Sequence, residues 1–170
     1  GGVDAHVLLH VFAQLQKLHS LLPVCVLHVH HGLHADAEQW TTHCQCICDE
    51  LGLSIKILRV NATAGVGESP EEMARIARYQ ALSAEMRADD CLLTAHHQDD
   101  QAETLLLQLV RGGRPHGLAA MALRNPLGPG WQARPFLGFT RDQIRSYAKE
   151  RGLQWVEDSS NADISFDRNY

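Results

Sequence analysis

The stretch CLLTAHHQDDQAETLLL, residues 91–107, decides the fold of this chain. Its apolar beginning, residues 91–95, predicts a short buried strand. The apolar spacing that follows predicts a helix that opens at Asp100 and ends before Gly112. The polar residues 96–99 therefore follow the carboxyl end of a strand. Ligands bind at that edge of an open parallel sheet, so this segment is a candidate binding site.

Helices and strands alternate along the whole sequence in the same way. This order predicts an α/β fold with an open, mainly parallel sheet and helices on both faces. The expected helices cover residues 7–18, 37–51, 70–87, 100–111 and a last segment between Thr140 and Gly152, and the expected strands cover residues 24–29, 54–60 and 91–95.

Capping signals support several of these boundaries. Ser69 followed by Pro70 is a strong helix start, a capping box begins at Thr140, and Gly52 is a typical helix stop. Residues 112–133 contain five glycines and three prolines, so we expect mostly loop there. A glycine turn that opens a helix at residue 1 should follow a strand, so we expect the first strand to be missing, with its place beside residues 24–29.

Composition narrows the class of protein. A chain of 170 residues with 45% hydrophobic and 21% charged residues is typical of one globular domain. We expect no membrane span and no signal peptide, and the ends of the sequence indicate a fragment cut on both sides.

The five cysteines, an odd number, favour a reducing cytosol. The net charge is −5, but residues 111–151 carry eight arginines and lysines against two acids, which favours local phosphate contact.

Two further segments carry candidate chemistry. The turn Gly1–Ala5 opens a helix, where free N–H groups bind anions, and Asp4 could hold a magnesium ion; a plain glycine turn capped by Asp4 is the alternative. The segment HVHHGLH at residues 28–34 lies at the carboxyl end of a strand, yet its histidines do not all share one side, which disfavours a metal site. The cysteines of residues 44–48 are expected to be buried core thiols.

The first segment remains the most specific. Adjacent carboxylates at one helix start repel each other unless a cation joins them, so a magnesium ion or an amine substrate would suit residues 99–103. A purely structural alternative is that Asp100 and Glu103 form a capping pair.

Taken together and in this order, these segments resemble the tRNA(Ile)-lysidine synthase family across essentially the whole chain. The matching motifs are HVHHGLH at 28–34 for the family's HVHHGLR, residues 77–81 for ARYxA, TAHHQDDQAET at 94–104 for TAHHxDDQAET, Arg111-Gly112 with GLAAM at 117–121, RPFL at 134–137 for RPLL, and WVEDSSNAD at 155–163 with the later Arg168-Asn169.

The resemblance implies a fold, an activity and partners. Such enzymes are N-type ATP pyrophosphatases (PP-loop proteins) with an adenine-nucleotide α-hydrolase-like, Rossmann-like fold, and residues 1–170 would be a partial N-terminal catalytic domain. The family is a cytoplasmic carbon–nitrogen ligase that adenylates the C2 carbonyl of the wobble cytidine of tRNA(Ile). Free lysine then displaces AMP and gives lysidine. ATP and Mg²⁺ would be the cofactors; no membrane is involved, and a homodimer is left open.

The resemblance also assigns residues. Asp4, Asp100 and Glu103 would be catalytic, Asp100 and Glu103 would hold the lysine, and Asp4 would hold Mg²⁺. The residues assigned to ATP are Gly1, Gly2, Val3, Asp4, Ala5, His28, Arg75, Arg78 and His96. The assignment of Arg111, Arg114 and Arg124 to tRNA comes instead from the basic charge of residues 111–151.

Two departures from the family pattern keep alternatives open. Ala5 replaces the last serine of SGGxDS and so lacks a hydroxyl donor to phosphate, and His34 stands where the family has arginine. The alternatives are a PP-loop tRNA thiolation enzyme, although the sequence contains no CxxC, and a non-catalytic nucleotide- or RNA-binding remnant.

Overall fold

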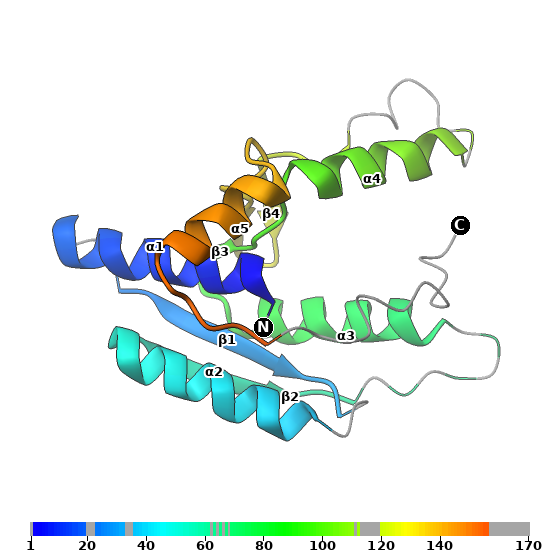
Figure 1. The fold of residues 1–170 in the computed structure, drawn as a ribbon. Coiled ribbons are helices and arrows are strands. Elements are labelled where there is room, and N and C mark those ends of the chain that lie inside the picture. The colour runs from blue at the N-terminus through cyan, green and yellow to red at the C-terminus, as the bar shows by residue number, and fades with distance from the viewer. Residues whose placement is uncertain are drawn as a thin grey trace. The chain divides into compact units, whose positions relative to one another are not determined.

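The computed structural model describes residues 2–19, 23–32, 36–61, 63, 65, 67, 69–110, 112 and 120–156. Helices and strands alternate through most of these residues (Figure 1). The elements are α1 (Val3–His19), β1 (Cys25–His30), α2 (Ala37–Leu51), β2 (Ser54–Arg59), α3 (Pro70–Glu85), β3 (Cys91–Leu93), α4 (Gln98–Val110), β4 (Arg124–Leu127), β5 (Gly130–Ala133) and α5 (Arg141–Glu150). None of the described helices has the length and apolar character needed to cross a membrane.

The chain divides into two compact units. The first contains Gly1–Leu8, Cys91–Pro126 and Trp131–Tyr170, and the second contains Leu9–Asp90 and Leu127–Gly130. The expected α/β class with parallel strands is confirmed. The described strands form two sheets, β1-β2 and β3-β5-β4, rather than one.

The second unit is built on the parallel pair of β1 and β2. Cys25 pairs with Ser54 and His30 pairs with Arg59, so the two strands are in register over their whole length. Helix α2 runs along this pair, and α3 also contacts β1 (Figure 1). A hydrophobic core of Ala13, Cys48 and Leu53, with partly buried neighbours from the strands, holds these elements together.

Local sequence signals set the helix ends in this unit as predicted. The Ser69 hydroxyl accepts a hydrogen bond from the Glu72 N–H at the start of α3, with Pro70 as the first helical residue. Gly52 ends α2 with φ of +71°, a left-handed conformation that glycine adopts without a steric penalty. The segment predicted as a strand over residues 54–60 is β2.

The first unit contains most of a three-stranded sheet in which β5 lies between β3 and β4. Strand β3 pairs with β5 in parallel, with Cys91 opposite Trp131 and Leu93 opposite Ala133. Two residues join β4 to β5, and the first, Gly128, has φ of +53°. The prediction that residues 112–133 are mostly loop is therefore wrong for β4 and β5. A glycine and a proline here form the turn of a hairpin rather than a long loop.

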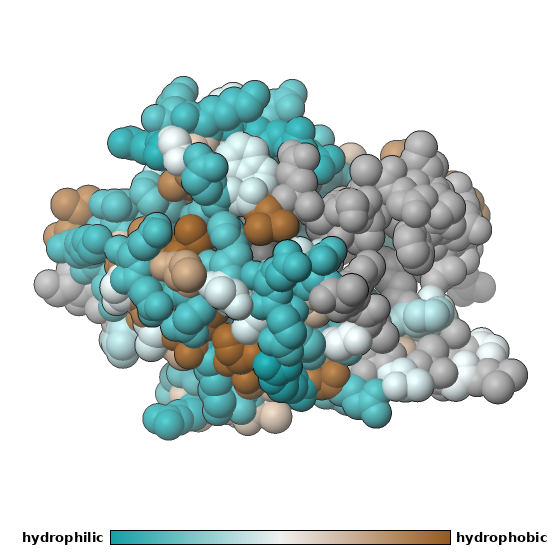
Figure 2. All heavy atoms as spheres, turned by 60° about the horizontal axis from the view of Figure 1, so that its bottom comes forward, coloured by the Kyte–Doolittle hydropathy of each residue, from teal (hydrophilic) through white to brown (hydrophobic). Residues whose placement is uncertain are grey.

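Burial alternates along β5 and the residues that follow it. Gly130, Gln132, Arg134 and Phe136 are buried, as expected when every second residue faces the same side of a strand. Helix α5 then begins at the predicted capping box, in which Thr140 and Gln143 exchange hydrogen bonds. On the face drawn in Figure 2, hydrophobic residues lie between hydrophilic ones.

Candidate functional site

His97 fixes the start of α4. Its backbone N–H donates to Asp100 Oδ2 at 2.8 Å, and the Asp100 N–H donates back to His97 Nδ1 at 3.4 Å. This reciprocal arrangement satisfies two N–H groups that lack partners within a helix. The predicted capping pair of Asp100 and Glu103 is therefore wrong. The helix begins at Gln98, two residues earlier than expected, so His97 takes the capping position and Asp100 the third helical position.

The imidazole of His97 also brings carboxylates together. It is buried, and its Nδ1 lies 3.3 Å from Asp100 Oδ2 and 3.7 Å from Asp99 Oδ2. On its other side, Nε2 lies 3.8 Å from Oδ2 of Asp4, in the first turn of α1. The second oxygen of Asp4, Oδ1, is buried without a hydrogen-bond partner among the described residues. The structure thus gathers Asp4 and Asp100 around a histidine that the sequence analysis did not assign.

Asp99 has a structural role that the sequence did not reveal. Its Oδ2 accepts a hydrogen bond of 2.9 Å from the backbone N–H of Arg141, the first residue of α5. This bond is the main reason why the pKa of Asp99 lies below its ordinary value. The adjacent Gln98 N–H donates to the Phe139 carbonyl at 2.8 Å, so the beginnings of α4 and α5 are tied together.

Glu103 lies in the second turn of α4, and its side chain is exposed. It follows Asp100 by three residues, so both carboxylates are on the same side of the helix. Asp100 already accepts one hydrogen bond in the helix start, yet a carboxylate has further lone pairs to offer. An amine could therefore be held between the two side chains.

The turn predicted to bind an anion is described from Gly2 onward, and Gly1 lies outside the described residues. Helix α1 begins at Val3, and the Gly2 carbonyl accepts from the His6 N–H at 3.2 Å. The N–H groups of the first turn have no partners within the helix, which is the basis of anion binding at such ends. Ala5 is exposed and brings no polar atom to this turn.

The histidines of β1 belong to the second unit and face α2. His28 Nε2 lies 3.2 Å from the Thr41 hydroxyl, and His30 Nε2 lies 3.3 Å from Glu38. Burial, aided by the neighbouring His30, lowers the pKa of His28 to about 4. Within the described part of the chain, no three histidine, cysteine, aspartate or glutamate residues are placed to hold a metal ion.

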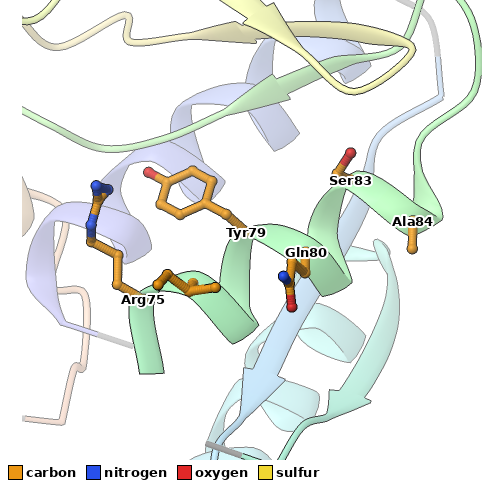
Figure 3. A pocket seen from close by; sticks show the side chains of 6 residues that line it. Arg75, Tyr79, Gln80, Ser83 and Ala84 are labelled. Atoms are coloured by element: carbon orange, nitrogen blue, oxygen red, sulfur yellow. The ribbon is translucent and has the colours of Figure 1, made fainter. Parts of the chain in front are cut away.

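The two arginines assigned to ATP are exposed on α3, also in the second unit. Arg78 Nε donates to His31 Nε2 at 3.3 Å, and burial and this arginine lower the pKa of His31. The guanidinium of Arg75 lies 5.8 Å from the centre of the Tyr79 ring. Arg75 and Tyr79, but not Arg78, line a shallow hollow along α3, shown in Figure 3.

The cysteines of α2 follow the core prediction only in part. Cys48 is fully buried, and burial raises the pKa of its thiol to about 11. Cys44 is half-buried and Cys46 is exposed. Cys44 and Cys48, four residues apart, share one side of the helix, whereas Cys46 faces another side, so the three thiols do not form a common ligand set.

Among the residues assigned to tRNA, Arg124 alone is described. It is exposed on β4, and its guanidinium lies 3.8 Å from the centre of the Trp131 ring on β5. Arg111 and Arg114 lie outside the described residues, as do His34 and most of the segment at residues 155–163.

Sequence reasoning missed a second group of polar residues, which contacts His96 through Thr94. Thr94, Gln132 and Arg134 form a run of hydrogen bonds that ends at the His96 ring. The signal was available in the sequence GWQARPF at 130–136. Its alternation places a glutamine and an arginine on the buried side of a strand, where polar side chains need partners.

The fold and these residues match the family model of the PP-loop domain over residues 1–170, and the chain belongs to this family. Among curated proteins it is similar to tRNA(Ile)-lysidine synthases. It is 48% identical to that of Pseudomonas fluorescens (strain Pf0-1), 49% to that of Pseudomonas aeruginosa and 46% to that of Vibrio atlanticus, each over all 170 residues. The chain spans 37–38% of the length of these relatives.

A solved structure shares the fold. The U34-tRNA thiolase NcsA from Methanococcus maripaludis, described with its [4Fe-4S] cluster, gives a TM-score of 0.75. The match covers 92% of this chain and 56% of the thiolase at 17% identity, so it shows a common fold only.

Proposed function

We propose that this chain is part of the catalytic domain of an enzyme that converts the wobble cytidine of tRNA(Ile) to lysidine. The observation that carries the proposal is the 44–49% identity to lysidine synthases over the whole chain. The grouping of Asp4 and Asp100 around His97 supports it, because it joins the anion-binding turn to the candidate amine site. ATP, free lysine and tRNA(Ile) would meet this protein in the cytoplasm, and a homodimer is left open.

Nucleotide binding is assigned to the start of α1. The N–H groups of the first turn would donate to phosphate oxygens. The fit to Mg²⁺ rests on Asp4 Oδ1, a buried carboxylate oxygen that has no partner among the described residues. Asp4 would supply one ligand, and phosphate oxygens and water would supply the others. A magnesium ion held by Asp4 would supply positive charge that offsets the negative charge on the leaving diphosphate.

Ala5 weakens this part of the site without removing it. The hydroxyl that the family pattern places there is absent, so one hydrogen bond to a charged phosphate is lost, worth about 1.5–3 kcal/mol. The backbone donors do not depend on that side chain.

Lysine binding is assigned to the carboxylates of Asp100 and Glu103. Two negative groups on one side of α4 would attract the lysine ammonium. The amine must lose a proton before it attacks the activated cytidine, and a carboxylate in contact with it can accept that proton. Glu103 suits this role because its side chain is exposed and lies in the second turn of α4, outside the helix start.

The test is an assay of the full-length protein with tRNA(Ile), ATP, Mg²⁺ and radiolabelled lysine. We expect label to enter the tRNA, with AMP and diphosphate released in equal amounts. Asp4→Asn should abolish the labelling of tRNA and the release of AMP and diphosphate. Lys17→Ala, an exposed change on the same helix, is the matched control. ATP-dependent transfer of sulfur to tRNA, or binding without any product, would instead favour the thiolation enzyme or the non-catalytic alternative.

A further inference from the structure

Four side chains of the first unit form one continuous run of hydrogen bonds. Arg134 Nη2 donates to Gln132 Oε1 at 2.8 Å, and Gln132 Nε2 donates to the Thr94 hydroxyl oxygen at 3.1 Å. The Thr94 hydroxyl then lies 3.0 Å from Nδ1 of His96. The run begins at a buried cation and ends at a ring that the family resemblance assigns to ATP.

The backbone holds this run in place. Gln132 and Arg134 are two residues apart, at the end of β5, so both side chains are on the buried side. The Thr94 N–H donates to the Ala133 carbonyl at 3.0 Å, which continues the parallel pairing of β3 with β5. Gln132 is 2% exposed and Arg134 is 9% exposed, so water competes little for these bonds.

Arg134 sets the direction of the hydrogen bonds as far as the Thr94 hydroxyl oxygen. A guanidinium has no acceptor, so the amide oxygen of Gln132 must face it. The amide nitrogen of Gln132 therefore faces Thr94 and donates to its hydroxyl oxygen. The hydroxyl hydrogen remains available to donate, and an unprotonated Nδ1 of His96, 3.0 Å from the hydroxyl oxygen, can accept it. A ring whose Nδ1 accepts carries its proton on Nε2 when it is neutral.

The other bonds of Arg134 keep it fixed at the head of the run. Its Nη1 donates to the Ala122 carbonyl at 2.8 Å and to the side-chain oxygen of Asn125. The Ala122 carbonyl, the Asn125 amide and the Gln132 amide are all neutral. These hydrogen bonds therefore hold the Arg134 guanidinium without an ion pair to a carboxylate. A cation in such surroundings polarises the hydrogen bonds that it donates.

We propose that Arg134, Gln132 and Thr94 are positioning residues that hold His96 with its proton on Nε2, so that the ring offers an N–H donor to a phosphate oxygen of the bound nucleotide. The tautomer is inferred from the direction of the hydrogen bonds that lead to the Thr94 hydroxyl. The ligand rests on the proposed function, since it requires that a nucleotide binds beside His96.

The decisive variant is Gln132→Glu. It keeps the size of the side chain and reverses the direction of the hydrogen bonds between residue 132, Thr94 and His96. A carboxylate beside Arg134 is ionised and can only accept, so the Thr94 hydroxyl must donate to it. The hydroxyl oxygen is then left to accept from His96, whose proton moves to Nδ1. We expect ¹⁵N NMR of the full-length protein labelled on histidine to show His96 as the Nε2–H form before the change and the Nδ1–H form after it. Loss of one signal in His96→Gln assigns the ring.

A matched pair at Thr94 tests the same point without a new charge. Thr94→Val removes the hydroxyl and should release His96 to a mixture of tautomers, whereas Thr94→Ser should keep the Nε2–H form. The affinity for ATP, measured by calorimetry without tRNA or lysine, should fall about tenfold or more in Gln132→Glu and Thr94→Val and stay unchanged in Thr94→Ser.

The two readouts separate the two proposals. A His96 tautomer that is the same in the wild-type protein and Gln132→Glu overturns the positioning role. A changed tautomer with unchanged ATP affinity overturns the phosphate contact. Failure of the wild-type protein to make lysidine would contradict the proposed function, yet the tautomer of His96 could still be read.

Discussion

At the scale of single residues, Asp100 and Glu103 have different structural roles. Asp100 takes part in the start of α4 through His97, so any substitution there changes both helix and site. Glu103 lies one turn further on, is exposed, and is not needed for that cap. It is therefore the carboxylate whose chemistry can be tested apart from the fold.

We expect Glu103→Gln in the full-length enzyme to retain adenylation of tRNA and the melting temperature. Its apparent affinity for lysine should fall tenfold or more, about 1.4 kcal/mol, because glutamine is neutral and cannot form an ion pair with the ammonium. Steady-state kinetics at varied lysine concentration measure the effect. Glu150→Gln, an exposed change at the end of α5, is the matched control. An unchanged lysine dependence would contradict the assignment.

The lowered pKa of His28 predicts that the free energy of unfolding depends on pH. Its pKa in the fold, about 4, is below the ordinary value of 6.5, so the folded protein disfavours the charged ring. The resulting stability is complete above pH 6.5 and decreases as the pH falls toward 4. Urea unfolding at pH 7 and pH 5 should show a smaller loss of unfolding free energy in His28→Gln than in the wild-type protein. His19→Gln, at the exposed end of α1, should leave the loss as it was.

At the scale of elements, the sequence predicted what local signals specify. Ser69, Thr140 and Gly52 act within a few residues of themselves, and the helix ends that they mark are confirmed. The hairpin of β4 and β5 was missed because its pairing with β3 joins residues about forty positions apart. The start of α4 was misplaced because histidine is an unusual capping residue, and its partner Asp100 looked like the cap itself.

The start of β5 yields a prediction about packing. A Cβ added at Gly130 would overlap the backbone oxygen of Asp90 and come within 3.0 Å of Met86 Cε. Gly130→Ala should therefore cost about 1–3 kcal/mol, because a backbone oxygen cannot move aside as a flexible side chain does. Gly138→Ala is the control, since a Cβ there meets nothing within 4 Å. Equal melting temperatures for both variants would show that β5 adapts to the added methyl group.

At the scale of the whole molecule, charge is distributed unevenly. The chain is acidic overall, while residues 111–151 carry most of its basic side chains. Arg124 is exposed there and lies over the Trp131 ring. A basic segment on an acidic body favours contact with the phosphates of a polyanion at one place rather than everywhere.

We expect combined replacement of Arg111, Arg114 and Arg124 by alanine in the full-length enzyme to weaken tRNA binding and to spare ATP binding. Each lost phosphate contact should reduce the slope of log affinity against log salt by about 0.7–0.9. Filter binding at several salt concentrations measures both quantities, with Lys56→Ala on β2 as a control outside the basic segment. The same affinity and slope in variant and wild type would exclude this segment from the tRNA surface.

The bond from Arg141 N–H to Asp99 connects the beginnings of two helices that are 42 residues apart in sequence. This amide hydrogen can exchange with deuterium only when the bond opens. If α4 separates from α5 before ligands enter, the exchange rate of Arg141 measures how often that happens. A nucleotide that holds the start of α4 in place should slow this exchange, and an Asp99→Ala variant should make it as fast as that of an exposed amide.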